Sequence, residues 1–95
     1  MEVKVIRLVS GEEIITFISK KTDDGYQLDN PCFIVPTENG VGLMELMPYT
    51  KISENGVFIK TESIVFMTEA VAGLEDQYKK VNSKIDLPPE KQIIV

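Results

Sequence analysis

Residues 8–18 read Leu8-Val9-Ser10-Gly11-Glu12-Glu13-Ile14-Ile15-Thr16-Phe17-Ile18, two apolar runs separated by a Ser-Gly pair and two glutamates. Glycine adopts backbone angles that other residues resist, so a chain reversal is expected at Gly11. The second run is apolar at neighbouring positions, whereas a strand exposed on one face alternates between apolar and polar residues. The stretch therefore predicts a β-hairpin whose second strand is covered on both faces.

Strand signals continue on both sides of this hairpin. Apolar and β-branched runs bounded by turn residues predict strands at residues 3–9, 13–20, 26–35, 41–49, 57–60 and 63–67. Asn30-Pro31 interrupts the third run, so that strand should bend or lie at an edge. Asn55-Gly56 is the strongest hairpin signal. Residues 41–49 form either the fourth strand itself or an insertion before it.

A helix is expected after the strands, over residues 69–84. Its apolar positions form a narrow helical stripe, Thr68 is a candidate N-cap, and lysines gather towards the end, which suits the helix dipole. We expect Leu74, Tyr78 and Val81 to cover the sheet or a neighbouring subunit, the alternative being a face for another partner. Two prolines stop the helix, and residues 92–95 either add a strand to another chain or are disordered.

The whole chain of 95 residues is short enough for one domain, with residues 1–68 as its β part and residues 69–95 as its helix and tail. The predicted core consists of Ile14, Phe17, Ile18, Leu28, Ile64 and Phe66. Apolarity on both faces of several strands suits a small, strongly bent barrel whose outer surface is covered by a helix or another subunit.

The residue types that are missing limit the chemistry. The chain has no histidine and one cysteine, so it lacks Ser-His-Asp and Cys-His nucleophile sets and the ligands of a zinc site. We expect neither an enzyme nor a bound cofactor. The acids Asp23, Asp24 and Asp29 lie around a glycine, an arrangement that suits a divalent cation, but they lack the spacing of a calcium loop and are otherwise solvated turn residues.

Charge and cysteine use bear on partners and location. The net charge is −5, and residues 1–68 hold ten acids against six bases, which disfavours nucleic-acid binding by bulk electrostatics. A local basic spot remains possible because salt screens exposed charges beyond about 8 Å. A lone cysteine, no signal-peptide pattern and no apolar run near the about 18 residues of a membrane span predict a cytoplasmic protein without membrane contact.

The opening hairpin resembles the first motif of the Sm-like family, two short strands around an L-x-x-G turn. Leu8, Gly11, Ile14 and Ile18 match this motif, and Thr16 stands where the family prefers glycine. Residues 59–64 are similar to the second motif, I-R-G-x-x-[IV], through the two framing isoleucines. Across its length the chain also looks like the short Sm-like proteins encoded by marine cyanophages, which implies the cytoplasm of a host cell.

The resemblance implies a fold and an assembly. The fold is mainly β, a small, strongly bent five-stranded barrel with, in this chain, a C-terminal helix. Sm-like barrels close into homo-oligomeric rings through strand pairing between neighbours, and ring closure pairs every exposed edge. For this chain the resemblance implies a ring of about five to seven subunits. The segment that would pair with a neighbour is read as Ile64, Val65, Phe66 and Met67.

The resemblance also implies single-stranded RNA at the ring pore, held by two loops. The corresponding residues here are Asp24, Tyr26, Asn30 and Lys60. Tyr26 would stack a base, or else it is half-buried in the barrel. Lys60 replaces the family's arginine, and its ammonium lacks the planar guanidinium that can form two parallel hydrogen bonds. Thr61 replaces glycine, so the backbone there must either differ from the family's or be strained. The competing interpretation is a structural or adaptor ring that binds no nucleic acid.

Overall fold

The computed structural model describes residues 2–85 and consists mainly of strands with one long helix after them. The elements are β1 (Glu2–Leu8), β2 (Glu13–Lys21), β3 (Gly25–Thr37), β4 (Gly40–Glu45), α1 (Ile52–Asn55), β5 (Val57–Lys60), the 3-10 turn η1 (Thr61–Ser63), β6 (Ile64–Thr68) and α2 (Ala72–Ile85). Most predicted strands are confirmed to within two residues at either end. No helix in this part of the chain is long and apolar enough to cross a membrane.

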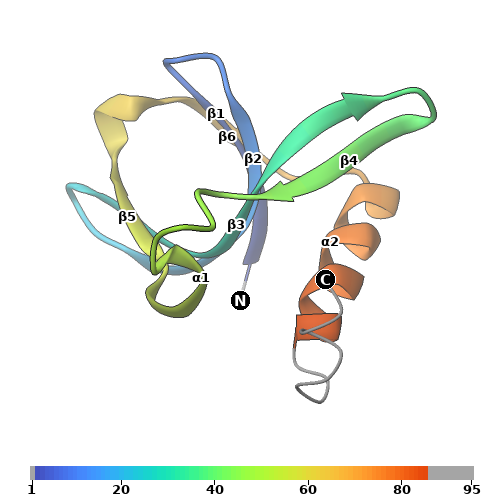
Figure 1. The fold of residues 1–95 in the computed structure, drawn as a ribbon. Coiled ribbons are helices and arrows are strands. Elements are labelled where there is room, and N and C mark those ends of the chain that lie inside the picture. Colours follow the sequence, from blue (N-terminus) through green and yellow to red (C-terminus); the bar gives the residue numbers. More distant parts are fainter. Residues whose placement is uncertain (1, 86–95) are drawn as a thin grey trace.

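All strand pairs are antiparallel and form one bent, six-stranded sheet. The order is β4-β3-β2-β1-β6. Strand β5 lies on the same side of β3 as β4 and pairs with the other half of that edge. The sheet curls so far that β5, η1 and β6 follow one another round its open side (Figure 1). Within residues 2–85 no ladder joins β6 to β4 or β5, so the sheet is not closed into a five-stranded barrel as predicted.

The segment between β4 and β5 differs from the extended run that the sequence predicted. The strand predicted at residues 41–49 ends at Glu45, and Met47 adopts a left-handed φ of 40° just before Pro48. The chain then forms α1, whose end is Gly56 with φ of 72°. The hairpin predicted at Asn55-Gly56 is therefore wrong, because the positive φ at Gly56 ends a short helix there.

The long strand β3 bends where the sequence predicted, although it lies inside the sheet. Asn30 has a left-handed φ of 53°, and Pro31 is fully buried behind it. The β2–β3 register shifts between Ile15 and Phe17 and again between Ile18 and Lys20. Thr16, also fully buried, donates from Oγ1 to the Asp29 carbonyl oxygen at 3.0 Å and so satisfies a group left unpaired by the irregular ladder.

Helix α2 covers the outer face of the sheet, as Figure 1 shows at the right of the molecule. The buried residues of this outer core are Val3, Ile15, Cys32 and Tyr78, with Leu74 packed against them. The predicted cover by Leu74 and Tyr78 is confirmed. The predicted N-cap Thr68 is wrong, because it belongs to β6 and the helix begins at Ala72.

The concave face of the sheet holds a second, inner core. Ile6, Ile14 and Leu28 are its fully buried members, and half-buried side chains such as Ile18 and Ile64 surround them. Of the predicted core, Phe17 is half-buried on the outer face.

Phe66 was also predicted to lie in the core, and that prediction is wrong, because its side chain is 48% exposed. The cause is a register shift opposite Arg7 and Leu8. Phe66 pairs with Arg7 and Ile64 with Leu8, which leaves Val65 as an extra residue. Such a bulge moves the next side chain to the other face.

Candidate functional site

Two loops meet at one end of the molecule, and we call this place, residues 22–25 with residues 60–62, the loop junction. Gly25 pairs with Lys60 in the β3–β5 ladder, and the Thr61 backbone N–H donates to the Asp24 carbonyl oxygen at 2.9 Å. A Cβ at Gly25 would lie 2.0 Å from the Ile59 carbonyl oxygen, so only glycine permits this approach. Two of the predicted RNA-binding residues, Asp24 and Lys60, are therefore neighbours.

The turn that carries the acids of the loop junction is held by a threonine. Thr22 Oγ1 accepts from the backbone N–H groups of Asp24 and Gly25, both at 3.2 Å. The Thr22 N–H in turn donates to the Gly25 carbonyl oxygen at 2.9 Å. This short-range hydrogen bonding is typical of Ser and Thr at turns. It leaves the side chains of Asp23 and Asp24 exposed.

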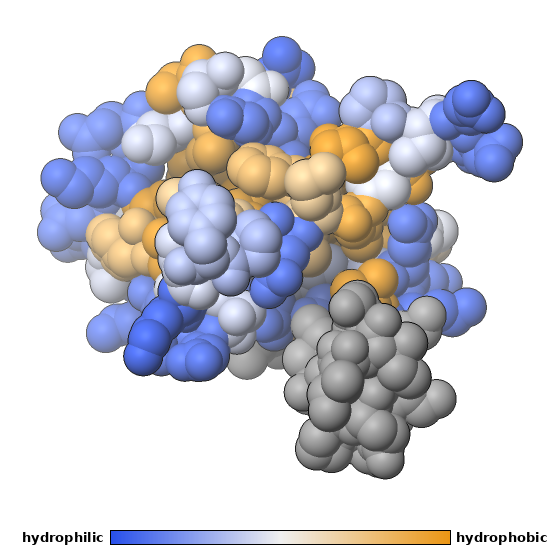
Figure 2. Space-filling model, viewed as in Figure 1, coloured by the Kyte–Doolittle hydropathy of each residue, from blue (hydrophilic) through white to orange (hydrophobic). Residues whose placement is uncertain are grey.

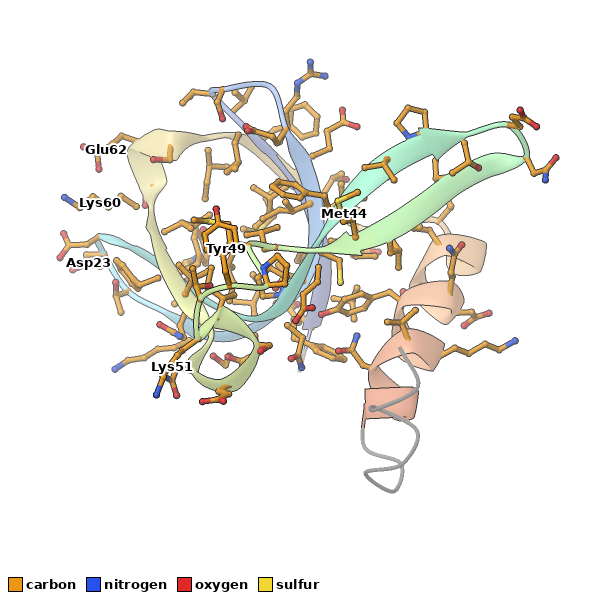
Figure 3. The ribbon with its side chains drawn as sticks, in the orientation of Figure 1. Asp23, Met44, Tyr49, Lys51, Lys60 and Glu62 are labelled. Carbon is orange, nitrogen blue, oxygen red and sulfur yellow. The ribbon has the colours of Figure 1, made fainter. Side chains whose placement is uncertain are left out.

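Lys60 is exposed among acids. Figure 3 shows Asp23, Lys60 and Glu62 together at this end, with their side chains directed outwards. Lys60 takes part in none of the three ion pairs found among the described side chains. Thr61 is not among the non-glycine residues with positive φ, which within residues 2–85 are Asn30 and Met47. The backbone here therefore carries no left-handed strain where the family has glycine.

Tyr26 and Asn30 do not join the exposed side chains of the loop junction. Tyr26 is half-buried and packs against the inner core, opposite Ile59 in the ladder. Its ring faces the concave side of the sheet, where it supports the fold. Asn30 lies farther along β3, where it lines a separate pocket together with Phe17 and Asp29.

Three strand edges are unpaired in the part of the chain described here. β6 pairs with β1 alone, and β4 and β5 each pair with β3 alone. Of the residues read as an interface, Val65 and Phe66 are 56% and 48% exposed, whereas Ile64 and Met67 are half-buried in the inner core. On β5, Phe58 is 43% exposed. Unpaired strand edges with exposed apolar side chains are templates for pairing with another chain.

An apolar surface lies beside the open edge of β4. Met44, Met47 and Val41 are each more than two-fifths exposed, and Tyr49 is 82% exposed. Figure 2 shows apolar surface across the middle of this face, from the β3–β4 hairpin towards hydrophilic surface at the β5 side. The Met47–Thr50 turn presents Tyr49, because Thr50 donates to the Met47 carbonyl oxygen from both N–H and Oγ1. The sequence pattern did not predict this surface, because residues 41–49 were expected to form one extended run.

The two buried groups with shifted pKa values are structural. Burial, with a smaller contribution from Glu45, raises the pKa of the Cys32 thiol to about 11, so the thiol stays protonated at neutral pH. Burial also raises the pKa of Tyr78 well above its ordinary value. No group of three or more His, Cys, Asp or Glu side chains within the described residues is placed to hold a metal ion. Asp23, Asp24 and Asp29 therefore do not form such a group.

Comparison with protein-family models gives no match for this chain, and comparison with the curated proteins gives none either.

Proposed function

We propose that this chain is an Sm-like subunit that assembles into a homo-oligomeric ring of about five to seven copies and contacts single-stranded RNA weakly at the loop junction. The observation that carries the proposal is the set of three unpaired strand edges, β6 at one end of a strongly bent sheet and β4 and β5 at the other. The two loops to which the resemblance assigns RNA contact also meet at one end of that sheet, through the Gly25–Lys60 pair.

The edges favour self-assembly. The β6 edge of one copy and the β5 or β4 edge of another are both unpaired, and antiparallel pairing between them would satisfy their free backbone groups. Val65, Phe66 and Phe58 would lose water at such a contact, and full burial of an apolar side chain contributes about 1.5–3 kcal/mol. A head-to-tail contact of this type closes into a ring when the rotation between copies permits.

RNA contact would depend on the Lys60 side chains of all subunits acting together in the ring. Each subunit contributes one exposed Lys60 at the loop junction, so a ring presents a circle of them, whose mutual repulsion a polyanion relieves. Asp23, Asp24 and Glu62 oppose this attraction because they are exposed on the same loops. The affinity should therefore be low and strongly dependent on salt.

The second candidate is a ring that acts in protein assembly without nucleic acid. The specific observation in its favour is the position of Tyr26, whose ring packs against the inner core and leaves the loop junction without an exposed aromatic side chain. Base–aromatic stacking is worth about 1–3 kcal/mol per base in single-strand binders, and this contribution would be missing.

Two measurements test the proposal in order. Sedimentation equilibrium of the full chain gives the absolute mass, and a closed oligomer is expected. A monomer at all concentrations would refute the ring. Titration of short U-rich and A-rich RNAs at several salt concentrations follows. Saturable binding with a negative slope of log affinity against log salt supports RNA contact. An oligomer that binds neither RNA at low salt supports the assembly role.

A further inference from the structure

An open pocket of about 480 Å³ lies at the bend of β3, away from the loop junction. One wall is formed by Phe17 of β2 with Asp29 and Asn30 of β3, and the other by residues 53–56, the end of α1. The volume is in the range of pockets that hold small ligands or single side chains. Neither the RNA proposal nor the strand edges use this pocket.

The sheet wall of the pocket is held in place by one buried side chain of α2. The Tyr78 hydroxyl accepts from the Phe17 backbone N–H at 3.1 Å and donates to the Asn30 carbonyl oxygen at 2.8 Å. The Asp29 carbonyl oxygen lies 3.2 Å from the same hydroxyl. The Tyr78 and Phe17 rings pack with centroids 5.1 Å apart. All three sheet residues that line the pocket therefore have positions set by Tyr78.

The α1 wall is also held closely. Gln27 Nε2 donates to the Asn55 carbonyl oxygen at 3.2 Å. A Cβ at Gly56 would lie 2.4 Å from the Leu28 carbonyl oxygen and 2.8 Å from Asp29 Oδ1, so the chain approaches β3 as closely as glycine allows. The Asp29 carboxylate is thereby placed directly against the end of α1. Both walls are preorganised, which lowers the ordering cost of binding.

The charged groups of the lining share one sign. Each wall contributes a carboxylate, Asp29 from the sheet and Glu54 from α1, and no lysine or arginine is among the described residues that line the pocket. Neither carboxylate takes part in an ion pair with a described side chain. Asn30, Ser53 and Asn55 add neutral oxygen acceptors, and Phe17 adds an aromatic surface. The complement of such a lining is an organic cation with several N–H donors.

A planar guanidinium fits this lining better than a compact ammonium. It presents several N–H donors in one plane, bonds a carboxylate through two parallel hydrogen bonds and stacks on an aromatic face. An ammonium offers three donors on a point charge and stacks less well. We propose that the pocket at the β3 bend binds a guanidinium group, carried either by a free small molecule or by an arginine side chain of another protein.

The test is calorimetric titration of the full chain with matched ligands. Blocked arginine (the N-acetyl methylamide) carries the guanidinium, blocked citrulline is its neutral isostere, and blocked lysine carries an ammonium. Saturable binding of blocked arginine is expected, with citrulline and lysine weaker by about tenfold or more, since hydrogen bonds between charged groups are stronger than neutral ones. No saturable binding, or equal binding of citrulline, would refute the proposal.

Matched variants separate the pocket from the general negative charge of the protein. Asp29→Asn and Glu54→Gln should each weaken blocked arginine by about tenfold. Asp23→Asn and Glu62→Gln make the same chemical changes at exposed carboxylates of the loop junction and should change the affinity less than about twofold. Equal weakening by both pairs would show general electrostatic attraction and refute the site. Circular dichroism and thermal melting establish that each variant is folded.

Two further arms identify the source of the guanidinium. Agmatine represents a free small molecule, and a short peptide with one internal arginine represents a protein side chain. Tighter binding of agmatine supports a small-molecule ligand, and tighter binding of the peptide supports a protein partner. In both cases amide chemical-shift changes should centre on Phe17, Asn30 and Asn55. Saturable binding with shifts elsewhere would overturn the assignment of this pocket.

Discussion

The two faces of the bent sheet differ in how completely this chain covers them. The outer face is closed by α2, and its core includes the fully buried Ile15 and Tyr78. The inner face is buried only at its centre, around Ile6 and Leu28, and Met44 on the same side is 55% exposed. One core is completed by the chain itself, whereas the other remains open at its edges. The comparison indicates that a partner is to be sought on the inner side and at the strand edges.

The largest effect should follow removal of the side chain that joins α2 to the sheet. Tyr78→Ala should lower the free energy of unfolding by about 3–5 kcal/mol, because it leaves a large cavity in the outer core and removes the hydroxyl. Urea denaturation followed by circular dichroism measures this. A loss below about 1 kcal/mol would mean that α2 contributes little to the outer core.

Assembly should respond most strongly at the β6 edge. Val65→Lys should prevent ring formation, because a charge would be desolvated against the neighbouring strand. Val65 is 56% exposed within one subunit, so the fold itself should be retained. Sedimentation velocity of the variant should show a monomer with a native circular dichroism spectrum. An intact oligomer would place the contact between copies elsewhere.

The hydroxyl of Tyr78 can be tested without a cavity. Tyr78→Phe should cost about 1–3 kcal/mol, because the Phe17 N–H and the Asn30 carbonyl oxygen lose their partner in a buried place. The difference from Tyr78→Ala separates the hydrogen bonds from the packing of the outer core. Urea midpoints of the two variants and the wild type are compared in one buffer. Wild-type stability for Tyr78→Phe would show that water satisfies these groups.

Phe66 tests whether an exposed side chain at the β6 edge contributes to the oligomer and not to the core of the subunit. In the Val65→Lys background, which isolates the subunit, Phe66→Ala should change the free energy of unfolding by about 0.5 kcal/mol or less, as at other exposed positions. The same substitution in the otherwise unchanged chain should weaken the oligomer. Thermal melting and sedimentation together measure both effects. A loss of about 3 kcal/mol in the isolated subunit would place Phe66 inside a core after all.

The smallest effects are expected at the loop junction. Lys60→Ala should weaken RNA binding and make its salt dependence shallower, and Glu62→Gln should strengthen binding modestly. Both residues are exposed, so stability should change by no more than about 1 kcal/mol. Fluorescence titration with a labelled RNA at several salt concentrations measures this. Wild-type binding by both variants would remove the loop junction from the RNA site.

Local patterns in the sequence located most of the elements. Apolarity on both faces of residues 13–20 predicted a strand covered from two sides, and α2 supplies the outer cover. The helical stripe with Leu74 and Tyr78 predicted that cover. These signals depend on periodicity and turn chemistry within a few residues, so they are readable without the fold. The absence of histidine was likewise the basis for expecting no histidine-dependent catalysis.

Contacts between distant parts of the chain decided the rest. A bulge at Val65 turned Phe66 outwards, pairing with β5 placed Tyr26 on the concave side, and the β3 bend separated Asn30 from Lys60. One extra residue in a ladder moves every side chain beyond it to the opposite face of the sheet. No local sequence pattern predicts where such a residue lies. The pocket at the β3 bend is also tertiary, because Phe17, Asp29 and residues 53–56 meet only once α1 and α2 have packed on the sheet.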